Sequence, residues 1–200
     1  IREQEDIEYL LPDIEKLMTE SLEGVNRIRE IVQGLKSFAH ADEASARNAD
    51  INDCLETTMK VVWNELKYKC EVRKELKPLP AIACFPGQLN QVFANLLINA
   101  AQAIETHGVI TISSAVEGDW IVVRVTDTGH GIAPEHIPKV FTPFFTTKPA
   151  GKGTGLGLPI AYGIVKRHNG AIEVESRPNY GATFTVRLPV DCHPVQHNSK

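Results

Sequence analysis

The chain has 200 residues, of which 42% are hydrophobic, enough for one domain-sized core and a smaller element. Its net charge of −4 and pI near 6.0 argue against nucleic acid or an anionic membrane surface as the main partner. No apolar run approaches the roughly 20 residues that a membrane helix needs. We therefore expect a small ligand or another protein as the partner.

The four cysteines, Cys54, Cys70, Cys84 and Cys192, lie far apart and form no CxxC pair. This spacing fits reduced thiols in a cytosolic protein better than a disulfide scaffold or a zinc site. The first residues, IREQEDIEYL, are neither a signal peptide nor an initiator methionine, so we expect a piece of a longer protein. We expect a cytoplasmic location, with any membrane contact only through segments outside this chain.

Residues 1–40 show the pattern of one long helix. Apolar or small residues recur at alternating steps of four and three, a heptad seam formed by Ile14, Met18, Ser21, Val25, Ile28, Val32, Leu35 and Ala39. A second apolar row widens the stripe, which favours a helix of a bundle or dimer over a helix packed on its own domain. The polar stretch ADEASARNAD then indicates a linker over residues 41–49.

The following segments alternate between helix and strand patterns. Asp50 or Asn52 could cap a helix that runs to about Lys67. The further expected elements are strands at 69–76 and 81–84, a helix from Pro86 to about His107, antiparallel strands at 109–116 and 120–127, a helix at about 157–168, and strands at 171–176 and 182–189. The long irregular stretch 128–156 is of a length that is usually functional. The fold class is α+β.

The stretch GKGTGLGL, residues 151–158, leads directly into a helical pattern. Unpaired N–H groups and the positive dipole end of a helix attract phosphate, and glycines let phosphate approach the main chain. A flexible surface loop would have the same composition. The Walker pattern is absent because glycine, rather than Ser or Thr, follows Lys152, and a long loop instead of a strand precedes the glycines, unlike a Rossmann turn.

Three amides share one stripe of the helix that follows Pro86. Gln91, Asn95 and Asn99 are spaced i, i+4, i+8, and apolar residues cover the other faces. Amides on a largely buried helix need partners. They either bond to neighbouring loops or act as neutral oxygen ligands for Mg²⁺ beside a phosphate.

The stretch DTGHGI, residues 127–132, ends a predicted strand. Its glycines permit a tight turn that leaves Asp127 at the mouth of the strand, where a carboxylate can accept a hydrogen bond from an amino group. Adenine offers such an amine where guanine has a carbonyl, so Asp127 could select ATP over GTP. An ordinary turn would also contain Asp-x-Gly.

Taken together, these stretches resemble a known family. Asn95 to Asn99, DTGHGI, FTPFFTTK (141–148), GTGLGL (153–158) and YGATF (180–184) have the order and spacing of the N, G1, F, G2 and G3 boxes of sensor histidine kinases. Residues 50–190 resemble the catalytic ATP-binding domain of that family, whose fold is shared with gyrase, Hsp90 and MutL. The resemblance implies a two-layer α/β sandwich of the Bergerat type, with a mixed sheet backed by helices.

The resemblance also implies the roles of individual residues. Asn99 would bind Mg²⁺, Asn95 would lie beside the phosphates, and Asp127 would read adenine. Lys148 would be a lid cation with a catalytic role like that of Asn95, and Phe141, Phe144 and Phe145 would anchor the lid unless they are ordinary core aromatics. The further expected contacts to ATP are Ala103, Gly129, Gly131, Ile132, Phe145, Thr147, Gly153, Thr154, Gly155, Leu156, Gly157, Leu158 and, against adenine, Thr183.

Residues 1–40 resemble the second helix of the dimerisation and phosphotransfer hairpin of these kinases. This implies a homodimer through that helix and a response regulator receiver domain as partner. The phosphoacceptor of the family is a His followed by an acidic residue on the first hairpin helix, and His40 is followed by Ala41. We find no acceptor pattern at any histidine, so we expect Mg·ATP binding without autophosphorylation by this chain alone.

Two alternatives stay open. A gyrase-like or MutL-like ATPase would need a Glu one helical turn before the metal-binding Asn, and that position is Asn95, a poor base. A regulatory module that binds nucleotide, or only dimerises, is the other alternative. The tail 191–200 contains no motif that we can interpret.

Overall fold

A computed structural model describes residues 46–149 and 153–192, together with residues 14, 17, 18, 21, 24 and 25. These six positions are helical, and the side chains of Ile14, Leu17, Met18 and Val25 are exposed. The other positions of the predicted N-terminal helix, most of the predicted linker and the tail after Cys192 lie outside the described residues.

The described elements form two sheets and three α-helices. Their order is β1 (Arg47–Ala49), α2 (Ile51–Leu66), β2 (Cys70–Leu76), β3 (Ile82–Cys84), α3 (Pro86–Ala103), β4 (Gly108–Glu117), β5 (Trp120–Asp127), the 3₁₀ turn η1 (Ile137–Lys139), α4 (Gly157–Arg167), β6 (Ala171–Ser176) and β7 (Ala182–Pro189). Five strands pair in the order β2-β4-β5-β7-β6, with β2 parallel to β4 and the other neighbours antiparallel. Strands β1 and β3 form a separate antiparallel pair.

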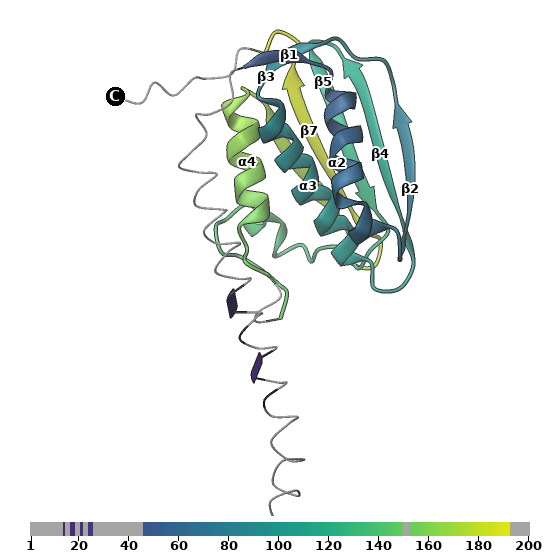
Figure 1. Cartoon of the computed structure of the whole chain (residues 1–200), viewed down its shortest axis with the longest axis vertical. Helices are drawn as coiled ribbons and strands as arrows, with labels where there is room; N and C mark the ends of the chain where they lie inside the picture. The colour runs from purple at the N-terminus through teal and green to yellow at the C-terminus, as the bar shows by residue number, and fades with distance from the viewer. Residues whose placement is uncertain are drawn as a thin grey trace, which may run out of the picture.

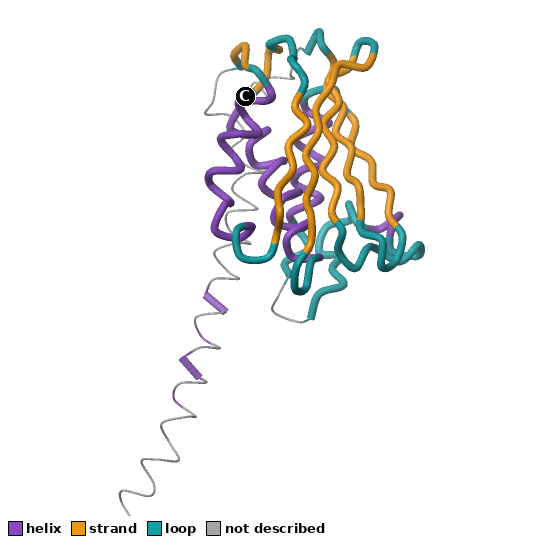
Figure 2. Tube along the Cα trace, turned by 90° about the vertical axis from the view of Figure 1, so that its right-hand side faces the viewer, coloured by secondary structure: helices purple, strands orange, loops and turns teal. Residues whose placement is uncertain are grey.

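The domain has two layers. Helices α2, α3 and α4 lie side by side against one face of the five-stranded sheet (Figure 1), and the view turned by 90° separates the helices from the strands (Figure 2). This arrangement confirms the predicted α+β sandwich with a mixed sheet. Within the described parts of the chain, no helix combines the length and the apolar character that membrane crossing requires.

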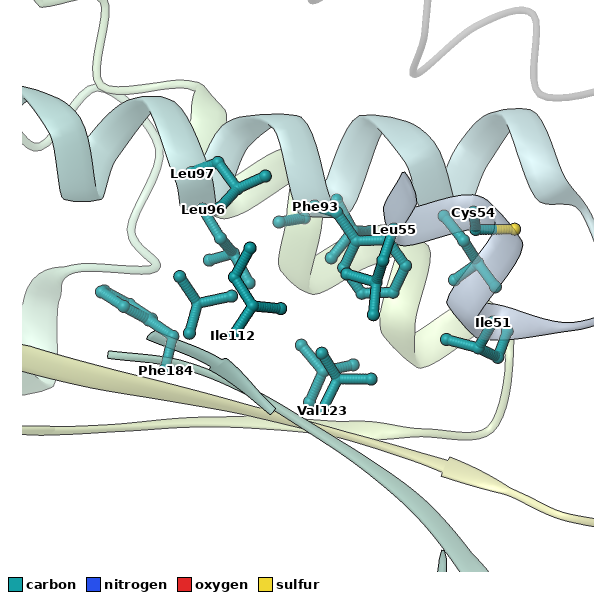
Figure 3. Packing of buried hydrophobic residues seen from close by; sticks show 14 of the residues in the cluster. Ile51, Cys54, Leu55, Phe93, Leu96, Leu97, Ile112, Val123 and Phe184 are labelled. Carbon is teal, nitrogen blue, oxygen red and sulfur yellow. The ribbon is translucent and has the colours of Figure 1, made fainter. Parts of the chain in front are cut away.

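The core fills the space between the layers. Figure 3 shows apolar side chains of α2 and α3 pointing toward those of the sheet; the labelled residues are Ile51, Cys54, Leu55, Phe93, Leu96, Leu97, Ile112, Val123 and Phe184. Burying a Leu, Ile or Phe side chain contributes roughly 1.5–3 kcal/mol, so this contact fixes the rotation of α3. The amide stripe of α3 is thereby directed away from the core.

Most predicted elements occur within a few residues of their expected bounds. Asp50 caps α2, since its Oδ1 accepts a hydrogen bond of 2.8 Å from the main-chain N–H of Asn52. Such a cap stabilises a helix by about 1 kcal/mol. Pro86 begins α3, as its fixed φ favours.

Two expectations were wrong in detail. Helix α3 ends at Ala103 and not near His107, because Ile104 turns to an extended conformation and the Ala103 carbonyl accepts from the N–H of His130. Residues 47–49 of the expected linker form strand β1, which pairs with β3 from Arg47 opposite Cys84 to Ala49 opposite Ile82. Both differences depend on contacts with distant parts of the chain.

Candidate functional site

A cavity of about 510 Å³ opens between α3, α4, the long loop and the ends of β5 and β7. Most of the predicted site residues line it: Asn95, Asn99, Ala103, Asp127, Gly131, Ile132, Phe145, Thr147, Lys148, Gly153, Thr154, Gly155, Leu156, Gly157 and Leu158. Gly129 and Thr183 do not line the cavity. Residues as far apart in the sequence as Gln91 and Phe184 therefore share one concave site of the kind that binds small molecules.

The amide stripe of α3 forms one wall of the cavity. Gln91, Asn95 and Asn99 line it, and Gln102 extends the same stripe by about one turn. Asn95 Nδ2 donates a hydrogen bond of 2.9 Å to the Gly157 carbonyl, so this side chain joins α3 to the start of α4. The Asn95 amide thus has a structural partner in addition to its predicted place beside phosphate.

Asp127 forms the deep end of the cavity, with only 3% of its surface exposed. Its Oδ1 accepts a hydrogen bond of 2.8 Å from the N–H of Gly129, and the N–H of Ala182 also donates to its carboxylate. Burial raises the pKa of Asp127, and these two main-chain donors oppose the shift by favouring the charged form. A buried carboxylate with remaining acceptor capacity suits an amino group of a ligand.

Close packing fixes the turn that follows Asp127. A Cβ on Gly129 would lie 2.5 Å from the Ala103 carbonyl oxygen, so the missing side chain lets the turn dock on the end of α3. Gly131 has φ +70°, and a Cβ there would overlap the Arg177 carbonyl. Gly129 therefore supports the position of Asp127 from outside the cavity.

The three aromatic residues predicted to anchor the lid have different environments in the structure. Phe141 packs on the core and against Tyr162, with ring centroids 5.4 Å apart, and Phe145 lines the cavity. The expectation for Phe144 was wrong, because its side chain is 67% exposed. Only its main chain anchors the loop: its φ is +67°, and its N–H donates 3.0 Å to the Gly155 carbonyl.

Lys148 reaches from the loop across the cavity to α3. Its Nζ donates to Asn99 Oδ1 at 3.1 Å and to Gln102 Oε1. A cation is thereby placed against the amide oxygen that the sequence assigns to a metal. Thr146 Oγ1 accepts from the Lys148 N–H at 3.2 Å and stabilises this part of the loop.

The glycine-rich stretch ends at the N-terminus of α4. Residues 153–158 all line the cavity, and α4 begins at Gly157. The first N–H groups of a helix lack intrahelical partners and carry the positive end of its dipole, so this wall attracts anions. Gly155 has φ +65°, and a Cβ there would come within 2.5 Å of the Phe144 carbonyl carbon.

Thr183 lies on the other face of β7 from the cavity. Ala182 and Phe184 line the cavity, and Thr183 Oγ1 instead lies 3.0 Å from Thr126 Oγ1 on the neighbouring strand. Side chains alternate along a strand, so Ala182 faces the cavity and Thr183 does not. The expected adenine contact through the Thr183 side chain is not supported.

Several residues outside the predicted set also line the cavity: Ile98, Gln102, His130, His136, Val140, Thr146, Pro159, Ile160, Ala182 and Phe184. Gln102 could have been found from the stripe of Gln91, Asn95 and Asn99. The two histidines lie in the irregular loop, where no periodic pattern indicates which side chains face inward. Their placement depends on the folded structure.

Comparisons with known proteins identify the family of the chain. The family described as histidine kinase-, DNA gyrase B- and HSP90-like ATPase matches residues 85–191. The sensor histidine kinase ZraS of Escherichia coli (strain K12) is 36% identical over 169 residues, which cover 83% of this chain and 36% of ZraS. The chain thus spans about a third of the length of this relative.

Solved structures have the same architecture. The catalytic domain of the histidine kinase ThkA superposes with a TM-score of 0.66 and 29% identity, over 74% of this chain and 97% of that one. Full-length ShkA in complex with AMPPNP superposes with a TM-score of 0.73 and 26% identity, over 89% of this chain and 38% of that one. The chain belongs to the histidine kinase-, gyrase B- and HSP90-like ATPase family, as the ATP-binding catalytic part of a sensor histidine kinase.

Proposed function

We propose that the cavity binds Mg·ATP and that the whole protein transfers the γ-phosphoryl group to a histidine, and from there to an aspartate of a response regulator receiver domain. The observation that carries this proposal is that negative and positive groups lie in different parts of the cavity. Its deep end holds the buried Asp127 carboxylate, and its other walls hold Lys148 and the N-terminus of α4. The carboxylate suits the amino group of adenine, and the positive charge of Lys148 and of the helix N-terminus suits a polyphosphate.

Asp127 would select the base. Its carboxylate already accepts main-chain N–H groups from Gly129 and Ala182, so its charged form is stabilised despite burial. The exocyclic amine of adenine would donate a further hydrogen bond, whereas guanine would present a carbonyl oxygen to the carboxylate. ATP should therefore bind in preference to GTP.

Asn99 would hold Mg²⁺. Its Oδ1 is a neutral oxygen of the type that a hard cation accepts. Lys148 Nζ, which donates to this oxygen at 3.1 Å, would move from it to the phosphates when the ion binds. A bound Mg²⁺ would neutralise charge on the phosphate oxygens during transfer. Lys148 and the first N–H groups of α4 would orient the same phosphates.

The surroundings of Asn95 favour transfer to a protein nucleophile over hydrolysis. Asn95 holds the position where an ATPase would carry a Glu to activate water, and its Nδ2 bonds to the Gly157 carbonyl. An amide is a poor base at any ordinary pH. Steady phosphate release by the purified chain, lost on Asn95→Ala, would instead support the ATPase alternative.

The acceptor histidine would lie in another part of the protein. Among the described histidines, His168 is fully buried, His130 and His136 line the cavity, and His107 lies in a bend before β4. Helical positions 14, 18 and 25 expose Ile, Met and Val along the predicted seam, as a dimerisation surface requires. We infer a homodimer through this helix, opposite a hairpin helix that carries the acceptor.

Calorimetric titration of ATP and GTP, with and without Mg²⁺, tests the nucleotide site. The wild type should bind ATP selectively, Asp127→Ala should lose this selectivity, and Asn99→Ala should lose the dependence on Mg²⁺. Phosphohistidine should form only on a supplied acceptor hairpin and not on this chain. Absence of ATP binding by the folded wild type would overturn the proposal and favour the interaction-module alternative.

A further inference from the structure

His136 has a buried ring nitrogen without a partner. The residue lines the cavity, and its ring packs against that of Phe145, with centroids 5.5 Å apart and planes at 57°. Within the described parts of the chain, its Nδ1 is buried and makes no hydrogen bond. An unpaired buried polar atom is energetically unfavourable, so a ligand that paired with it would gain affinity.

The other polar side chains of this part of the cavity already have partners. His130 Nδ1 lies 2.6 Å from the Gly131 carbonyl oxygen, and Lys148 Nζ donates to Asn99 and Gln102. Asp127 accepts from Gly129 and Ala182 at the deep end. The Nδ1 of His136 is therefore a polar atom whose partner the protein itself does not supply.

His136 lines the cavity and lies close in the chain or in space to residues of both parts of the proposed nucleotide site. It follows Ile132 of the predicted base pocket by four residues, and it packs on Phe145, which precedes Lys148 by three residues. The polar groups of ATP between its base and its phosphates are the ribose hydroxyls. A hydroxyl both donates and accepts, so it can pair with either tautomer of the imidazole.

We propose that His136 is a specificity-determining residue whose Nδ1 pairs with a ribose hydroxyl, so that the site prefers ATP to the deoxy analogue that lacks this hydroxyl. This inference rests on the proposed ATP binding. The ring contact with Phe145 fixes the direction of the imidazole, and Phe145 forms the adjoining wall of the cavity. Recognition of the base is assigned to Asp127, as proposed above.

The test compares ATP, 2′-deoxy-ATP and 3′-deoxy-ATP by calorimetry on the full chain with Mg²⁺ present. The wild type should bind ATP about fivefold to tenfold more tightly than the analogue that lacks the paired hydroxyl. His136→Phe keeps an aromatic ring against Phe145 but removes the nitrogen, and it should bind ATP and that analogue equally. His107→Phe, at an exposed position away from the cavity, is the matched control and should keep the wild-type ratio.

Two further variants distinguish the nitrogens of the ring. Asn places its amide near Nδ1 and Gln near Nε2, so His136→Asn should retain the preference for ribose and His136→Gln should lose it. This pair decides the question should His136→Phe fail to fold. The inference would be overturned if the ratio of the affinities for ATP and deoxy-ATP kept its wild-type value in His136→Phe and His136→Gln. It would also be overturned if these variants changed the ratio of the affinities for ATP and GTP and kept the sugar preference. Failure of the wild type to bind ATP would overturn the proposed function itself.

Discussion

Lys148 donates a hydrogen bond across the cavity to Asn99, with Nζ and Oδ1 3.1 Å apart. Lys148 belongs to the long loop and Asn99 to helix α3. The position of the loop is therefore connected to the atom proposed to bind the metal. Gln102 Oε1 is a second acceptor for the same ammonium group.

Replacement of Lys148 by Met should weaken ATP binding and leave adenosine binding unchanged. A charged hydrogen bond contributes roughly 1.5–3 kcal/mol, so we expect a loss of about tenfold or more for ATP. Lys139→Met, on the exposed turn η1, is the control and should bind ATP as the wild type does. An equal loss for ATP and adenosine would show that Lys148 orders the loop and does not meet phosphate.

Asp127→Asn should lower the affinity for ATP about tenfold or more and abolish the preference over GTP. The amide has one acceptor oxygen in place of two, while Gly129 and Ala182 still donate. Burial raises the pKa of Asp127, so protonation begins at a higher pH than for an ordinary Asp, and the selectivity of the wild type should fall as the pH falls. Competition titrations of ATP against GTP at several pH values check this, and Asp127→Asn should show no such pH dependence.

Gly131→Ala should destabilise the domain much more than Gly118→Ala. Both glycines have positive φ, +70° and +62°, so alanine costs about 1 kcal/mol of backbone strain at either position. At Gly118 the new Cβ has no atom within 4 Å, whereas at Gly131 it overlaps the Arg177 carbonyl. Urea unfolding measures the difference, and equal free energies of unfolding would contradict this packing argument.

His168 should make stability fall in mild acid. Its Nε2 accepts from the Phe85 N–H at 3.1 Å, its Nδ1 lies 2.8 Å from the Ile164 carbonyl, and burial lowers its pKa. The folded state then binds fewer protons than the unfolded state below the unfolded pKa of about 6.5, so stability is lost as the pH drops below that value. The slope from this group is at most about 1.4 kcal/mol per pH unit.

Urea unfolding at pH 7.5 and pH 5.5 measures this effect. His168→Gln should be less stable at pH 7.5 but should lose less stability on acidification, because glutamine does not titrate. His107→Gln should keep the wild-type pH dependence. A wild-type slope retained in His168→Gln would assign the acid sensitivity to another group.

The elements that local patterns specify could be predicted well from the sequence. The apolar periodicity of α3, the cap at Asp50 and the antiparallel pairing of β4 with β5 each depend on nearby residues, and each occurs where the pattern places it. The end of α3 and strand β1 depend instead on pairing with His130 and with β3. Such partners are distant in sequence, so propensity alone does not indicate them.

The residues of the candidate site also differ in whether the sequence alone predicts their positions. The spacing of Asn95 and Asn99 follows from the helical repeat, and Gly157 lies at a helix start that the pattern indicates. Which of Ala182 and Thr183 faces the cavity depends on the register of β7 with β5, and the inward direction of His136 depends on Phe145. Both require the three-dimensional arrangement.

The pairing of β1 with β3 also determines how force would pass through the domain. Strand β3 leads through Phe85 into α3, the helix that bears Asn95 and Asn99. A pull on the chain ahead of Arg47 would act along two hydrogen-bonded strands and be shared between them before it reached α2 or α3. The two strands thus form a hydrogen-bonded connection from the residues that precede α2 to the strand that leads into α3 and its amide stripe.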